Sequence, residues 1–163
     1  MQLDTIQACA ELLYTEARRL DQRDWDGWLD LYLPEATFWI PMWDNEYELT
    51  TDPQSQLSLM WYGDRSGLED RVFRIRTGMS SASVPLPRTV HQISNILVEP
   101  QGDGDLMVYS NCQTMSYRHK TVDNFYCHYE HRLRPVAGTL KIAAKKIIVA
   151  NDLIRDVLDF YRV

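Results

Sequence analysis

Four histidines are the side chains in this sequence best suited to bind a catalytic metal: His91, His119, His128 and His131. A mononuclear iron or zinc site needs two such ligands on one face of an element, together with a carboxylate. His128 and His131 lie three residues apart in a strand-like segment, so they point to opposite faces. His119 falls at an expected hairpin tip. We therefore expect no metal site in this chain.

Three cysteines, Cys9, Cys112 and Cys127, complete the set of potential metal or redox ligands. None has the spacing of a zinc clip, and none has the Cys-and-His pairing of a Rieske iron–sulfur cluster. Free thiols in a reducing cytoplasm are the simplest interpretation. The sequence also lacks a glycine-rich phosphate loop and a Gly-x-Ser-x-Gly nucleophile elbow. We expect no catalytic, cofactor-binding or metal-binding residue here.

Acid–base chemistry in an apolar pocket is harder to exclude, because it needs only a carboxylate or histidine and a tyrosine. Tyr14, Asp30, His91 and His128 are the candidates for a stand-alone lyase or isomerase. The plainer interpretation, which we favour, places Tyr14 at a helix edge, Asp30 in local bonds, and both histidines in hydrogen-bonded sheet positions. A small-ligand-binding module without chemistry is a third hypothesis.

Helical patterns dominate the first half of the chain. Apolar residues recur at three- and four-residue steps from Leu3 to Leu20, which predicts one amphipathic helix. A shorter helix is expected from Asp24 to Pro34, then a strand at 37–40 and a polar loop at 44–56. A third helix is expected over 64–77, with Gly78 as its C-terminal cap.

Strand patterns fill the second half, at 88–98, 106–118, 125–133 and 140–149, with turns at 101–104, 119–123 and 135–138. Helices followed by a meander predict a single α+β domain over residues 1–163. A strongly twisted antiparallel sheet wrapped around the N-terminal helices would form a cone with an internal pocket.

Composition and charge limit the kinds of partner that this chain could bind. The formal net charge of −6 opposes nucleic-acid binding, which needs a basic surface. No apolar run approaches the roughly 20 residues that span a bilayer, and the first residues lack the pattern of a signal peptide. We therefore expect a cytoplasmic protein.

Five tryptophans and nine tyrosines indicate either core packing or a subunit interface. The apolar segment 153–163 is expected to dock on its own domain or on a neighbour.

Several blocks together resemble the small (β) subunits of aromatic-ring-hydroxylating dioxygenases, in the expected order along nearly the whole chain. The most specific are Gly67-Leu68-Glu69-Asp70-Arg71-Val72-Phe73-Arg74-Ile75 and Pro87-Arg88-Thr89-Val90-His91-Gln92-Ile93-Ser94-Asn95-Ile96. The others are Arg19-Leu20-Asp21, Trp28-Leu29-Asp30-Leu31-Tyr32, Phe38-Trp39-Ile40-Pro41 and Leu158-Asp159-Phe160-Tyr161. They look closest to the benzoate, toluate and anthranilate branch.

The resemblance implies the cone fold of nuclear transport factor 2 and scytalone dehydratase, and a structural, non-catalytic role. It implies a large α subunit as partner, usually three of each, with copies of this chain also in contact. The Rieske [2Fe–2S] cluster and the mononuclear iron are expected in that α subunit. A reductase would supply electrons, and the product would be a cis-diol of an aromatic acid.

Overall fold

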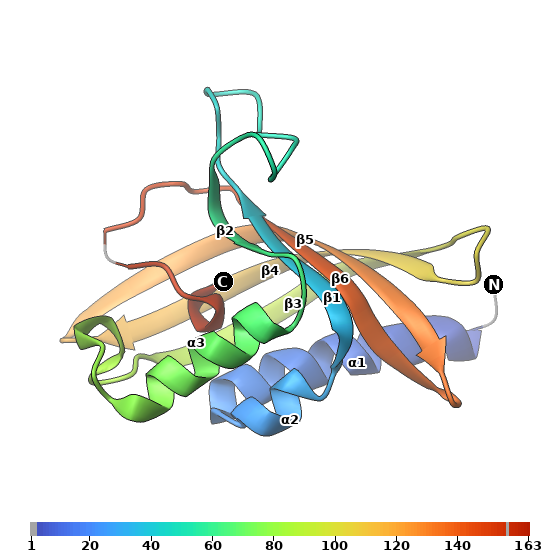
Figure 1. Ribbon diagram of the computed structural model, residues 1–163, viewed down its shortest axis with the longest axis horizontal. Helices are drawn as coiled ribbons and strands as arrows, with labels where there is room; N and C mark the ends of the chain where they lie inside the picture. The colour runs from blue at the N-terminus through green and yellow to red at the C-terminus, as the bar shows by residue number, and fades with distance from the viewer. Residues whose placement is uncertain (1–2, 156) are drawn as a thin grey trace.

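One six-stranded sheet curls around the helices in the computed structural model, which describes residues 3–155 and 157–163 (Figure 1). The helices are α1 (Leu3–Gln22), α2 (Trp25–Leu29) and α3 (Ser66–Thr77), with short 3₁₀ turns at Ser81–Ser83 and Phe160–Arg162. The strands are β1 (Tyr32–Pro41), β2 (Ser58–Tyr62), β3 (Arg88–Pro100), β4 (Leu106–Arg118), β5 (Thr121–Val136) and β6 (Thr139–Val149). The predicted cone-shaped α+β fold is confirmed.

The strand order is β2-β1-β6-β5-β4-β3, so β2 and β3 form the two edges of the sheet. Strands β3 to β6 form the predicted antiparallel meander. The expectation of a purely antiparallel sheet was wrong, because β1 runs parallel to β6. A hairpin would force antiparallel pairing, but β1 and β6 are far apart in the chain and can pair either way. Strand β2, which pairs with β1, was not predicted.

The second helix is shorter than predicted. It starts after Asp24, whose side chain accepts a hydrogen bond from Gly27 N, and it ends at Leu29. Strand β1 then begins at Tyr32 and contains Pro34. Proline is tolerated there because the pairing of β1 with β6 is interrupted between Tyr32 and Thr37, where no ladder N–H is needed. Gly78 caps α3 in the left-handed conformation, as predicted, at φ 63°.

The helices lie against the concave face of the sheet, as Figure 1 shows. The buried core side chains come from both the helices and the sheet. Side chains alternate along β4 as predicted, with Leu106, Val108, Ser110, Cys112 and Thr114 all buried. No helix in the described residues is long and apolar enough to cross a bilayer.

Candidate functional site

Four ionisable side chains from four elements meet inside the cone: Glu16 of α1, Tyr32 of β1, His131 of β5 and Lys145 of β6. Each is at most 2% exposed. Lys145 Nζ lies 2.8 Å from Glu16 Oε1, and His131 Nε2 lies 3.0 Å from Glu16 Oε2. The Tyr32 hydroxyl donates a third hydrogen bond to the same carboxylate. We call these four residues the interior cluster.

Helix and strand periodicity explains why the side chains of the interior cluster point to the inside of the cone. Glu16 lies three residues after Leu13 and four before Leu20, on the buried face of α1. His131 and Lys145 are direct partners in the β5–β6 register. Because both side chains point to the concave face, they reach Glu16 from the sheet side.

The pKa values of the cluster follow from burial and from mutual charge. Burial opposes ionisation of Glu16, but the Lys145 ammonium and His131 together outweigh it and hold the pKa of Glu16 far below its ordinary range. Burial lowers the pKa of His131 more than Glu16 raises it. Burial, and then the Glu16 charge, raises the pKa of Tyr32 well above its ordinary value. At neutral pH the cluster therefore holds a carboxylate, a neutral imidazole and a neutral phenol.

This arrangement suits a structural role better than catalysis. The Glu16 carboxylate already accepts hydrogen bonds from three donors, so it is poorly placed to take a proton from a substrate. The Tyr129 ring covers Lys145, with Nζ 4.2 Å from the ring centroid. Five surface cavities of about 270 to 560 Å³ are lined by other described residues, and none includes a cluster member.

The four residues predicted for an acid–base pocket do not come together. Tyr14 is 52% exposed on α1, and Asp30 is exposed after α2. His128 is exposed on β5, where Nδ1 lies 2.9 Å from Asn111 Oδ1. His91 is buried against α1. The structure therefore contradicts the alternative of an acid–base pocket and agrees with the favoured interpretation, in which Tyr14 lies at a helix edge. The expectation that His128 and His131 point to opposite faces of the strand is confirmed.

Sequence reasoning missed Glu16, Tyr32 and Lys145, and it assigned His131 only to a sheet position. A signal was present. Glu16 interrupts the apolar face of the first helix, and Lys145 interrupts the apolar run of the last strand. A charged side chain at a core position needs an ionic partner, and the two interruptions have opposite charge.

The Arg19-Leu20-Asp21 and Thr89-x-His91 blocks contact each other. Asp21 accepts hydrogen bonds from the Thr89 hydroxyl at 2.9 Å and from the His91 backbone N–H at 3.1 Å. Its carboxylate also lies 2.6 Å from His91 Nδ1. These contacts fasten the end of α1 to edge strand β3.

The Leu-Glu-Asp-Arg block contacts the end of the chain. Arg71 of α3 forms a two-pronged ion pair with Asp159, whose side chain is 2% exposed. Phe160 stacks on Trp28 with ring centroids 4.5 Å apart. Residues 160–163 are buried, so the end of the segment docks on its own chain. Asp156 lies outside the described residues.

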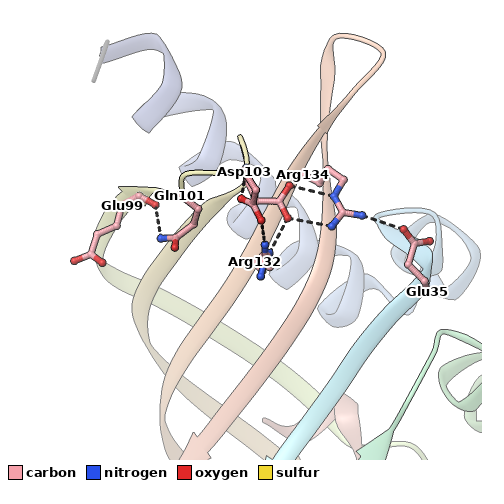
Figure 2. A network of polar contacts seen from close by, with 7 residues as sticks. Glu35, Glu99, Gln101, Asp103, Arg132 and Arg134 are labelled. Atoms are coloured by element: carbon pink, nitrogen blue, oxygen red, sulfur yellow. Dashed lines mark hydrogen bonds and ion pairs between the residues drawn. The ribbon is translucent and has the colours of Figure 1, made fainter.

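A further ionic network lies at the surface around the turn between β3 and β4 (Figure 2). Asp105 receives Arg132 Nε at 2.7 Å and Arg134 Nε at 3.1 Å. Arg132 also pairs with Asp103, and Arg134 reaches Glu35 of β1 at 3.1 Å. The network links three parts of the sheet, and its charges are satisfied within it.

Potential metal ligands are dispersed over the described residues, where no three His, Cys, Asp or Glu side chains form a group that could hold a metal ion. All three cysteines are buried free thiols. Burial raises the pKa of each of them, which opposes formation of the thiolate that binds metals.

A curled sheet around three helices, closed inside by an ionic cluster, defines a cone-fold α+β protein. The same fold occurs in a putative scytalone dehydratase from Novosphingobium aromaticivorans, with a TM-score of 0.69 at 14% identity over 99% of this chain and 96% of that chain.

The chain belongs to the ring hydroxylating beta subunit family, whose model matches residues 15–156. The toluate 1,2-dioxygenase subunit beta of Pseudomonas putida is 52% identical over 96% of this chain and 97% of its own length. The crystal structure of the benzoate 1,2-dioxygenase beta subunit of Burkholderia mallei has a TM-score of 0.80 at 39% identity, covering 100% of this chain and 98% of that one. An anthranilate 1,2-dioxygenase small subunit is also among the relatives. The predicted similarity to the benzoate, toluate and anthranilate branch is therefore confirmed.

Proposed function

We propose that this chain is the non-catalytic, structural β subunit of a Rieske non-haem iron dioxygenase that cis-dihydroxylates an aromatic acid of the benzoate or anthranilate type. The observation that carries the proposal is family membership over most of the chain, with relatives named as β subunits of toluate, benzoate and anthranilate dioxygenases. The complex would add both atoms of dioxygen to the ring during aromatic catabolism.

The cofactors belong, in this proposal, to a large α subunit that carries both the Rieske [2Fe–2S] cluster and the mononuclear iron. The chemistry of the present chain supports this division. The buried Glu16 carboxylate is already occupied by three donors of the same chain, and burial holds the thiols protonated. No residue of this chain is assigned a catalytic, cofactor-binding or metal-binding role.

The assembly we propose contains three α and three β subunits in the cytoplasm, and it takes electrons from a separate reductase. Neither nucleic acid nor a membrane is a partner, since the net charge is −6. A naphthalene 1,2-dioxygenase structure contains a chain of the same fold, with a TM-score of 0.77 at 18% identity. At 18% identity, this similarity shows that the two chains share a fold and nothing more.

Co-expression with a large subunit that carries a Rieske motif tests the function. We expect a stable complex of equal stoichiometry that contains iron and converts benzoate, toluate or anthranilate to a cis-diol. The chain purified alone should contain no stoichiometric iron by elemental analysis. A monodisperse chain that does not bind the large subunit, or a chain that binds iron itself, would contradict the proposal. Either result would favour the stand-alone cone-fold lyase or isomerase.

A further inference from the structure

The segment between β1 and β2, residues 42–57, rises beyond the body of the sheet (Figure 1). We call it the acidic arm. It carries four exposed carboxylates, from Asp44, Glu46, Glu48 and Asp52, and it contains no Lys, Arg or His. In the described residues none of the four makes an ion pair within the chain. The arm therefore presents an uncompensated negative charge.

The acidic arm is held in one shape by its own hydrogen bonds. Asn45 Oδ1 accepts from Tyr47 N at 2.9 Å and from Glu48 N at 3.1 Å. Trp43 Nε1 donates to Val149 O at 2.8 Å and ties the arm to β6. The Tyr47 side chain of this arm is 91% exposed. An ordered segment with an exposed aromatic loses little conformational entropy when it binds.

A surface of opposite charge lies near the other edge of the sheet. We call its five residues the basic edge patch: Arg88, Val90, Tyr117, Lys120 and Val122. Arg88, Tyr117 and Val122 are partners across β3, β4 and β5, and all five residues are exposed. The Arg88 guanidinium lies 4.6 Å from the Tyr117 ring centroid. Val90 and Val122 are 51% and 59% exposed, which gives the patch an apolar component.

Additional positive charge lies beside the basic edge patch. Arg23 is exposed and donates to Pro87 O at 3.2 Å, next to Arg88. Two carboxylates in neighbouring segments are already engaged, since Asp21 bonds to His91 and Asp123 pairs with Arg162 at 2.7 Å. The patch and its surroundings thus match the acidic arm in charge and in apolar character.

We propose that the acidic arm of one copy of this chain docks on the basic edge patch of a second copy. The arm extends from edge strand β2 and the patch includes edge strand β3, at opposite sides of the sheet. The match is therefore between copies, through a head-to-tail contact that closes into a ring if the rotation permits. This rests on the proposed function and deepens it, because it names the surfaces through which β subunits meet.

Complementary charge reversals test the contact by analytical ultracentrifugation, on the chain alone and on its complex with the large subunit. The arm variant is Asp44→Lys/Glu46→Lys, and the patch variant is Arg88→Glu/Lys120→Glu. We expect each to weaken self-association by roughly tenfold or more. Asp70→Lys/Glu99→Lys is the matched control for the arm variant, because it makes the same charge change at exposed sites outside both surfaces and should leave association unchanged.

Mixing the two variants gives the sharper test. The intact patch of the arm variant should bind the intact arm of the patch variant, so the mixture forms mixed pairs that neither variant forms alone. The lysines of the changed arm and the glutamates of the changed patch do not repel each other, so any larger complex in the mixture should contain the two variants in alternation and in equal number. Absence of pairs in the mixture, or unchanged self-association of either variant, would overturn the proposal. So would a wild-type chain without contacts between its own copies, alone and in the complex.

Binding of the large subunit separates this proposal from the proposed function. Pull-down of both variants by the large subunit at wild-type levels, with self-association lost, supports the contact between copies. Loss of large-subunit binding by the arm variant, with self-association intact, would assign the arm to the large subunit and refute the present inference alone. A wild-type chain that fails to bind the large subunit would refute the proposed function instead.

Discussion

Replacement of Lys145 by methionine removes the ammonium from the interior cluster while keeping most of the side-chain volume. Glu16 then remains buried with only the hydroxyl of Tyr32 and the ring N–H of His131 as donors. Removal of one partner from a buried ion pair typically costs about 3–5 kcal/mol. That is a large fraction of the roughly 5–15 kcal/mol by which proteins of this kind are stable.

The loss should lower the melting temperature by about 6–20 °C, since 1 kcal/mol corresponds to roughly 2–4 °C at this chain length. The double variant Glu16→Gln/Lys145→Met removes both charges but leaves a side-chain amide for Tyr32 and His131. We expect its stability to lie within about 2 kcal/mol of wild type, because a buried pair is costly mainly when it is broken.

Urea denaturation followed by circular dichroism at pH 7.5 measures each unfolding free energy. If a broken pair is what costs stability, the coupling energy between the two substitutions should be strongly favourable. A Lys145→Met chain that loses less than about 1 kcal/mol would refute it. A double variant as unstable as the sum of the singles would refute it equally.

Four other outcomes follow from the contacts described above. The pKa of His131 is lowered in the folded chain, so the unfolded chain binds this proton first as pH falls below about 6.5. The free energy of unfolding should therefore decrease on acidification, by at most about 1.4 kcal/mol per pH unit from this group. His131→Gln should remove that slope, and the exposed His128→Gln should not. Glu16, with its depressed pKa, should add a further loss as pH falls below about 5, measured in the same titration. Asp21→Ala should cost about 1 kcal/mol in urea denaturation, since two partly buried donors on β3 lose their acceptor, and an unchanged midpoint would contradict this. Arg71→Met should release the C-terminal segment and speed its cleavage by carboxypeptidase, whereas cleavage at the wild-type rate would show that other contacts hold the segment.

Much of the fold could be predicted because local patterns and tertiary contacts agree in the second half of the chain. Strand β4 lies at its predicted bounds, and its alternation matches the observed burial. The first half was harder. Strand β2 is only five residues long with mixed burial, and β1 contains a proline, so neither pattern was clear from sequence.

The interior cluster was not predicted, because its members come from four elements whose arrangement depends on strand order. Sequence periodicity places Glu16 on a buried face, but it does not say which strands lie opposite. The parallel pairing of β1 with β6 brings Tyr32 beside the other members, and no local pattern encodes that pairing. For the same reason, sequence alone could not exclude the alternative pocket that included Tyr14 and Asp30.

The contacts also explain why the family blocks are informative about fold but not about chemistry. Asp21 joins α1 to β3, and Arg71 joins α3 to the end of the chain, so two pairs of blocks are internal fastenings of the cone. The interior cluster likewise satisfies its own charges. What remains available to partners is the exposed surface, where the uncompensated charges of the acidic arm lie. A supporting subunit needs that division: an interior that holds one shape, and an exterior whose charges are left for its neighbours.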